Sequence, residues 1–453
     1  MILLIKPKNI SNAILLSLYL LSSTAYAYLT PKPHIGPAGI EFQSNIGLNY
    51  GYDDNVNFQS DNTPQVASEF FNLKPFLKLE GKRDADIYTI EYSGDYRKHQ
   101  EEATSDDYDD HTIKFTSVWK KGFNSDILFT IENQFGHENR GEGLTDGFTT
   151  YNEDQPDENS GSFEKYGIND VLKTNLFNTA LRYSLDKQDS IGKLSFEVQY
   201  KDFNYDDRPS NTSDNNIDSF NLYIKDQNWN QTTFTLELFD QASSRTRFRY
   251  SIVSNLRSYD ENSLKDTNET FLIAGIKTQQ TGKTTIDANI AWLYKTFPNQ
   301  PNYQEFSGLN WDIDIAWSPV KHSTFHLFTN QSVEDPTEIG GFVLNTTYGT
   351  RWEHFWWSNN ISTELGFNYK TSADKHQDDD KVITDTDAII ALKYKFRPSV
   401  LFELSYQQLI SKSNKDSDDF TIPNAQTPGE LIPVVQQVGY DKSIIMFTTK
   451  VQI

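Results

Sequence analysis

Hydrophobic and polar residues alternate with a period of two along most of this chain. In the segment from Ala85 to Lys98, hydrophobic residues recur at even positions, namely Tyr88, Ile90, Tyr92 and Tyr96. Similar alternation occurs in Ser125–His137, Lys193–Lys201 and Leu309–Trp317. Successive side chains of a β-strand point to opposite faces of its sheet, so this period predicts strands with one apolar and one polar face. We therefore expect an all-β fold.

The segments between the predicted strands are alternately short and long. The short connections include Gly81–Asp84, Lys121–Asn124, Asp186–Ser190, Gln241–Ser244, Gln279–Gly282, Pro319–His322 and Pro398-Ser399. The long ones include Asp53–Ser68, His99–Asp109, Glu138–Asp170, Asn204–Ile217, Asp260–Asn268, Thr371–Lys381 and Ser413–Val438. Outer-membrane barrels have tight periplasmic turns and longer outer loops. About 18 strands result if Asp218–Asp240 is one long strand, and 19 if it divides near Asn228–Asn230. An even number leaves both ends of the barrel on the periplasmic side, so we predict 18.

The alternating faces need different surroundings. In a bilayer every backbone polar group must be hydrogen-bonded within the protein, and strands achieve this in a closed barrel, with apolar faces toward lipid and polar faces inside. The low hydrophobic content, 36%, would also suit a disordered chain, but such chains are poor in aromatic residues and this one has 14%. The sequence thus predicts a transmembrane antiparallel up-and-down β-barrel with short periplasmic turns and long acidic extracellular loops.

The N-terminal 27 residues have the layout of a secretory signal peptide. Two lysines precede the apolar stretch Ala13–Leu21, and Ala25-Tyr26-Ala27 then provides a small-x-small cleavage site. An uncleaved membrane anchor is the alternative, but the apolar run is short for crossing a bilayer. We expect cleavage after Ala27, a periplasmic segment over 28–39 and the barrel over 40–453.

The charged residues on the polar faces are both basic and acidic, so we expect a mixed interior. The lumen-lining candidates are Arg97, Arg245, Arg247, Arg249, Asp312, Asp314, Arg351, Glu364, Lys393 and Lys395. Arg245, Arg247 and Arg249 alternate along one predicted strand; such a stripe either orients polar solutes or pairs with neighbouring carboxylates. The net charge of −22 then arises mainly in the long loops. Among these, Glu138–Asp170 is the best candidate to fold inward as a constriction.

Other chemistries find little support in the sequence. The acidic balance argues against a nucleic-acid partner, which requires a basic footprint. Asp53-Asp54-Asn55-Val56-Asn57 has oxygen ligands at alternate positions, as a calcium loop does, but the required glycine and final glutamate are missing. There is no G-x-S-x-G motif and no cysteine. We therefore expect no catalytic residues, no metal site and no cofactor.

The opening strand carries a recognisable motif. Gly47-Leu48-Asn49-Tyr50-Gly51-Tyr52-Asp53-Asp54-Asn55-Val56, followed by the strands around Leu73-Lys74-Pro75 and Tyr88–Tyr96, resembles the putative β-barrel porin type 2 family. The resemblance covers Ile40 to Ile453. Members are outer-membrane barrels frequently encoded near exopolysaccharide or capsule genes, so the resemblance implies a role in the export or passage of surface polysaccharide. It implies no catalytic residues.

These observations predict a non-enzymatic channel in the outer membrane that passes polar solutes or assists exopolysaccharide export. Its expected partners are outer-membrane lipid, lipopolysaccharide, the barrel-assembly machinery and components of polysaccharide export. Two other classes stay open. One is a structural or adhesive barrel whose acidic loops bind cations, and the other is an outer-membrane hydrolase.

Overall fold

The computed structural model describes residues 34–36, 39–60, 63–122, 124–149, 161–186, 192–209, 215–279, 281–300, 305–335, 342–356, 359–374, 381–415 and 417–452. The predicted signal peptide, its cleavage after Ala27 and most of the predicted periplasmic segment lie outside these residues and stay predictions.

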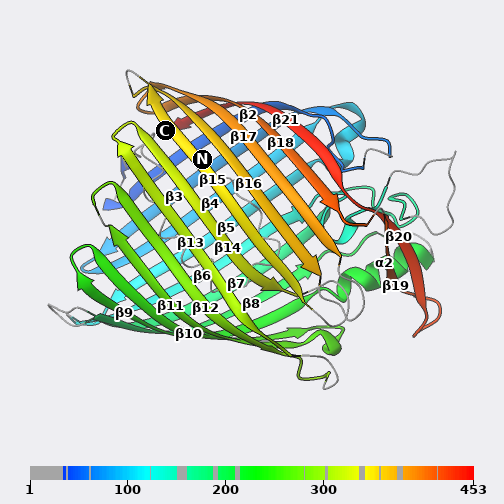
Figure 1. Cartoon of the computed structure of the whole chain (residues 1–453), viewed down its shortest axis with the longest axis horizontal. Coiled ribbons are helices and arrows are strands. Elements are labelled where there is room, and N and C mark those ends of the chain that lie inside the picture. The colour runs from blue at the N-terminus through cyan, green and yellow to red at the C-terminus, as the bar shows by residue number, and fades with distance from the viewer. Residues whose placement is uncertain are drawn as a thin grey trace.

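One antiparallel sheet closes on itself to form the body of the molecule (Figure 1). Eighteen described strands make its wall: β2 (Glu41–Asp53), β3 (Ser68–Arg83), β4 (Asp86–His99), β5 (Tyr108–Lys120), β6 (Ser125–Glu138), β7 (Leu172–Asp186), β8 (Gly192–Tyr205), β9 (Trp229–Ser243), β10 (Thr246–Tyr259), β11 (Thr267–Gln279), β12 (Thr284–Thr296), β13 (Phe306–Val320), β14 (Ser323–Glu334), β15 (Val343–Trp356), β16 (Ile361–Asp374), β17 (Val382–Arg397), β18 (Val400–Ser413) and β21 (Tyr440–Gln452). A two-residue strand, β1 (His34–Ile35), pairs with the start of β2. The predicted all-β barrel of 18 strands is confirmed.

The barrel closes where the first long strand meets the last. β2 and β21 pair antiparallel from Asn45 opposite Gln452 to Asp53 opposite Ile444, and β21 also pairs with β18. Closure gives each wall strand two neighbours and leaves no free edge. We call the junction of β2 and β21 the seam.

The connections divide by length between the two ends of the barrel. The short turns, such as Ser244-Arg245 between β9 and β10, lie at the left end in Figure 1, where β2 also starts and β21 ends. The long connections lie at the other end, which we call the outer end. Three of them contain short 3-10 helices: η2 (Glu101–Asp106), η3 (Gly143–Thr145) and η4 (Ser263–Lys265). The predicted alternation of connections is confirmed.

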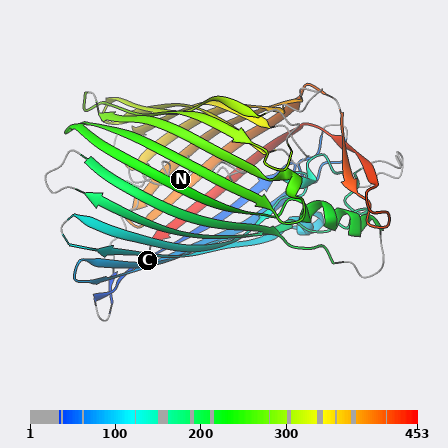
Figure 2. The same ribbon diagram turned by 90° about the horizontal axis from the view of Figure 1, so that it is seen from below.

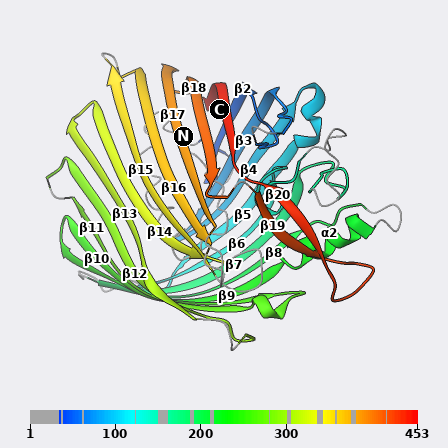
Figure 3. The ribbon, with the colours of Figure 1, turned by 45° about the vertical axis from the view of Figure 1, so that its right-hand side comes forward.

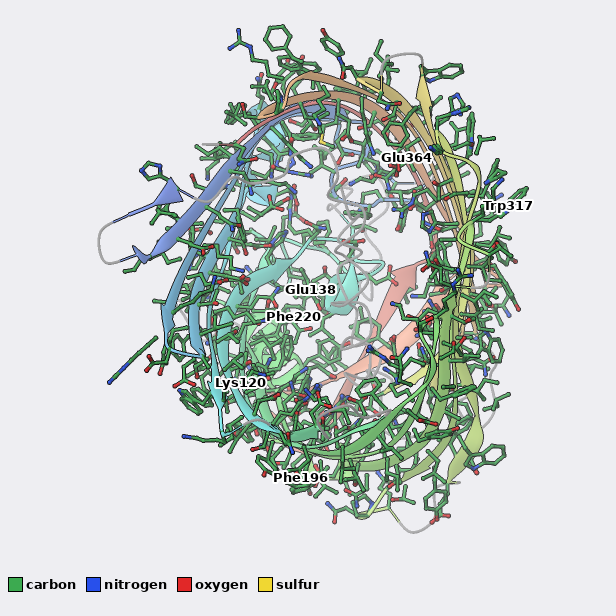
Figure 4. The ribbon with its side chains drawn as sticks, turned by 90° about the vertical axis from the view of Figure 1, so that its left-hand side faces the viewer. Lys120, Glu138, Phe196, Phe220, Trp317 and Glu364 are labelled. Carbon is green, nitrogen blue, oxygen red and sulfur yellow. The ribbon has the colours of Figure 1, made fainter. Side chains whose placement is uncertain are left out.

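The apolar faces of the strands point outward. On β2, Leu48, Tyr50 and Tyr52 are exposed. Asn49 and Asp53, which occupy the alternate positions, are buried. Figure 4, viewed along the barrel, shows Phe196 and Trp317 on the outside of the wall and Glu364 on its inside. In the described part of the chain, no helix is long and apolar enough to cross a bilayer.

The structure corrects two predictions about the long connections. The prediction of one strand over Asp218–Asp240 is wrong, because α2 (Asn215–Lys225) precedes β9 (Trp229–Ser243). Its buried residues Phe220, Tyr223 and Ile224 have i, i+3, i+4 spacing, which is helical. Likewise, the predicted loop Ser413–Val438 contains a hairpin of β19 (Ser417–Pro423) and β20 (Leu431–Gln437).

Candidate functional site: the inner wall and the outer cap

Most of the residues predicted to line the interior stand on the polar face of their strands. They are Arg97 on β4, Arg247 and Arg249 on β10, Asp312 and Asp314 on β13, Arg351 on β15, Glu364 on β16, and Lys393 and Lys395 on β17. Each alternates with outward apolar residues, as Lys395 does with Tyr394 and Phe396. Arg245 is the exception. It lies in the tight turn before β10, so the predicted three-arginine strand stripe is reduced to two residues.

Several of these residues contact one another or their neighbours. Lys393 forms an ion pair with Glu364 across β16 and β17. Arg249 Nη2 donates to Asn289 Oδ1 at 2.9 Å, and Asn289 stands opposite Asp312 in the β12–β13 register. The Arg97 guanidinium lies 4.3 Å from the ring centre of Phe70. The inner face therefore combines paired charges with amide and aromatic partners.

A second set of inner ion pairs includes Lys74, Lys78, Arg182 and Lys193, which were not among the predicted inner charges. Ion pairs run around the inner face from β3 to β8: Lys74–Asp95 at 2.8 Å, Lys78–Glu91 at 3.7 Å, Lys114–Glu132 at 3.1 Å, Lys193–Asp126 at 3.3 Å and Arg182–Glu197 at 2.7 Å. On β3 the lysines alternate with Leu73, Leu77 and Leu79. That alternation was a usable signal, but Pro75 occupies an outward position and obscures it.

The outer end carries a compact subdomain, which we call the cap. It consists of the described parts of three long connections: 139–171, 206–228 with α2, and 414–439 with β19 and β20. Its buried apolar residues form one core with Leu172 of β7 and Tyr205 of β8: Leu144, Phe148, Phe163, Tyr166, Ile168, Phe220, Tyr223, Ile224, Phe420, Ile422 and Val434. Burial raises the pKa of the Tyr166 hydroxyl to about 12. Figures 2 and 3 show α2, β19 and β20 together at this end.

Direct contacts join the three connections to one another. The ring centroids of Phe148 and Phe220 are 5.6 Å apart, and those of Tyr223 and Phe420 are 5.5 Å apart. The Ala425 backbone N–H donates to Ser219 Oγ at 3.0 Å. In the view along the barrel, Glu138 and Phe220 lie inside the ring of strands (Figure 4). The cap thus overlies part of the barrel mouth, and its main segment is the connection predicted as a constriction.

Polar contacts occur at the rim of the barrel, within the cap and between the two. Arg140 makes two hydrogen bonds to the carboxylate of Asp106, at 2.9 and 2.7 Å. Tyr205 Oη donates to Glu138 Oε1 at 2.6 Å. Arg208 donates to the carbonyl oxygens of residues 170 and 171, each at 2.9 Å. Charge-assisted and bidentate hydrogen bonds are the stronger kind, and the Arg140–Asp106 contact is of this kind and ties the cap to the rim.

A buried ion network occupies another part of the inner wall near the outer end. Asp335, which follows β14, forms ion pairs with Lys295 on β12 and Arg257 on β10. Lys295 also lies 3.2 Å from Glu269 on β11, and Tyr259 Oη donates to Asp335 at 3.1 Å. Burial alone would raise the pKa of Asp335, but Lys295 and Arg257 hold it well below its usual range.

Apolar side chains accompany this network on the inner side of β10, β11 and β12. Val253, Phe271, Ile273, Ala291 and Leu293 are buried there and pack with Val333 at the end of β14. These strands are therefore apolar on both faces over part of their length. Asp335, the residue directly after β14, is held beside them at the outer end.

The sequence motif of the opening strand, β2, makes side-chain contacts across the seam. Asp53 pairs with Lys442 at 2.9 Å, and Asp54 accepts hydrogen bonds from the Ser443 backbone N–H at 2.6 Å and its Oγ at 2.7 Å. Asn55 Nδ2 donates to the carbonyl oxygen of Asp441 at 2.9 Å. These contacts tie the end of β2 to the start of β21. Among the described residues, no group of His, Asp or Glu side chains is arranged to hold a metal ion.

The sequence matches the family described as Putative beta-barrel porin 2 over residues 148–425. No curated protein matches it. Among solved structures, the outer membrane protein OpdK from Pseudomonas aeruginosa is similar with a TM-score of 0.46 and 10% identity, over 91% of this chain and 99% of that one. A BenF-like porin from Pseudomonas fluorescens Pf-5 gives a TM-score of 0.47 and 9% identity, over 91% of this chain and 99% of that one. The FrpB iron transporter from Neisseria meningitidis gives 0.45 and 10%, over 91% and 82%.

Proposed function

This chain belongs to the Putative beta-barrel porin 2 family, and from that premise we propose that it is a non-enzymatic outer-membrane channel for polar solutes whose outer mouth is narrowed by the cap. The main support for the proposal is that the outer and inner faces of the barrel wall differ in polarity. Large apolar side chains cover its outside, whereas ion pairs and amides run around its inside. A barrel of 16 to 18 strands is wide enough to leave an aqueous channel.

The parts of the interior that are filled by side chains indicate where solutes would pass through the barrel. The cap core includes residues at the outer ends of β7 and β8, and the apolar cluster with the buried ion network covers part of the inner face of β10, β11 and β12. Among the described residues, a continuous stretch of inner face outside these two clusters runs from β15 through the seam to β5. Of the predicted candidates, it includes Arg97, Arg351, Glu364, Lys393 and Lys395. We infer that solutes pass along this side.

The planar lipid bilayer is the direct test of the channel. The purified full-length protein, inserted from detergent into such a bilayer, is expected to give discrete conductance steps in KCl. A second protein, lacking the hairpin residues 417–437, is expected to give larger or longer openings, because the cap loses one of its three segments. If neither protein conducts, although both are inserted and heat-resistant, the channel proposal fails.

A structural barrel is the second candidate, and the cap is the observation that favours it. A mouth that is partly covered by a cap with its own apolar core suits a surface protein as well as a channel. Absence of conductance in both proteins, together with cation-dependent binding to lipopolysaccharide, would favour this candidate.

The remaining parts of the proposal rest on the sequence. We propose that the N-terminal 27 residues direct export and are removed after Ala27, and that the barrel-assembly machinery inserts the chain. The family resemblance further supports polysaccharide export components as partners. Mass measurement of the mature N-terminus tests the first point, and loss of surface polysaccharide on gene deletion tests the last.

A further inference from the structure

Three lysines form a row across the seam. On the inner face, Lys74 of β3 stands opposite Gly47 of β2, and Gly47 stands opposite Lys450 of β21. Lys450 in turn stands opposite Leu401 of β18, which stands opposite Lys395 of β17. Residues directly opposite on neighbouring strands share a face, so the three ammonium groups project from one side of the sheet. We call Lys74, Lys395 and Lys450 the lysine row.

The strands show that this side is the interior. Tyr394 and Phe396, the neighbours of Lys395, are 44% and 52% exposed on the outer face. Gly47 adds no side chain between Lys74 and Lys450, and a Cβ there would meet the Lys74 Cβ at 3.4 Å. The Lys74 side chain is 42% exposed, so this part of the inner wall is open to solvent.

The charges around the row do not cancel it. The adjacent row of opposed residues consists of Asn72, Asn49, Thr448, Glu403 and Lys393, and Glu403 is its single carboxylate. Lys393 is paired with Glu364, and Lys74 is paired with Asp95. Within the described residues, neither Lys395 nor Lys450 has a carboxylate at ion-pair distance. Two ammonium groups thus face a single nearby unpaired carboxylate.

We propose that the lysine row is an anion-recognition site, which selects solutes carrying carboxylate, sulfate or phosphate groups. The inference deepens the proposed channel function and rests on it. Fixed charges inside a low-dielectric wall focus their field into the lumen and concentrate counter-ions there. The site would make the route anion-preferring, although the whole chain carries a net charge of −22.

The first test is the reversal potential of single channels in a KCl gradient. Wild-type protein is expected to prefer Cl⁻ over K⁺, and the double variant Lys395→Gln/Lys450→Gln is expected to lose that preference. Lys120→Gln is the matched control, because Lys120 lies near the same end of the barrel but is paired with Asp126 at 3.2 Å. The control is expected to shift the potential less than the double variant. A cation-preferring wild type, or equal shifts in the control and double variant, would overturn the proposal.

A second test needs no current and therefore separates this site from channel function. Asn45→Cys places a thiol on the inner face of β2, two residues from Gly47. In detergent, an anionic methanethiosulfonate reagent is expected to modify this thiol about tenfold faster than a cationic one. The preference should disappear when Lys395→Gln and Lys450→Gln are added. If it persists unchanged with them, the lysine row is not the site. Preference in this assay without conductance in bilayers would retain the site and reject the channel.

Discussion

Asp335 reaches from the end of β14 to Lys295 on β12, and the two charged groups are buried together inside the barrel wall. Lys295 has no exposed surface, and Arg257 on β10 shares the same carboxylate. This relationship fixes Asp335, directly after β14, at the outer end of the lumen. It also gives the interior one of its least replaceable charges.

Asp335→Asn is expected to destabilise the barrel strongly. Removing one partner of a buried ion pair leaves the other charge uncompensated and costs about 3–5 kcal/mol. The thermal unfolding of detergent-solubilised protein measures the loss. Asp207→Asn is the control, since its pair with Lys225 at 2.9 Å is half exposed and such pairs contribute at most about 1 kcal/mol. Equal unfolding temperatures for the two variants would contradict this account of the network.

The buried ion network also predicts how the difference in unfolding temperature between wild type and Asp335→Asn depends on pH. The pKa of Asp335 is lowered in the folded barrel, so its contribution to stability is fully present above its ordinary unfolded value of about 3.9. The contribution is then lost as the pH falls toward the folded-state pKa. The difference in unfolding temperature between wild type and Asp335→Asn should therefore be constant from pH 8 to about pH 5 and shrink below about pH 4. A difference that shrinks already near pH 7 would point to another group.

The cap is expected to unfold separately from the barrel. Phe220 is fully buried in its core, and Phe220→Ala removes packing worth about 3–5 kcal/mol. Limited proteolysis should cut this variant faster within the cap, while the heat resistance of the barrel stays unchanged. Leu222→Ala is the control on the same helix, because Leu222 is 41% exposed. Equal cleavage of both variants, or simultaneous loss of the barrel, would show that the cap is not a separate unit.

The strands of the wall could be predicted from the sequence, because a bilayer requires apolar and polar side chains to alternate within each strand. Lipid on one side and polar contacts on the other leave a local signal, as at Tyr394, Lys395 and Phe396. The cap could not be predicted in the same way. α2 is surrounded by polar loop residues, and its spacing of Phe220, Tyr223 and Ile224 is only one helical repeat. Its core forms between connections that are far apart in the chain.

The side-chain contacts inside the barrel could not be predicted from the sequence either. The pairing of Asp53 with Lys442 depends on the register of the first strand with the last, which no local pattern encodes. The lysine row likewise requires four neighbouring registers. Arg245 illustrates the opposite error, because extending the alternation by one step placed a turn residue in a strand.

Cysteine scanning along β17 tests the central claim most directly, since the chain contains no cysteine of its own. Single cysteines at Ile390, Leu392, Lys393, Tyr394 and Lys395 in proteoliposomes would be treated with a charged, membrane-impermeant thiol reagent. The account predicts modification at Lys393 and Lys395, which face the lumen, and protection at the three positions that face lipid. Equal modification along the strand, or protection at both lysine positions, would contradict a barrel with lipid outside and water within.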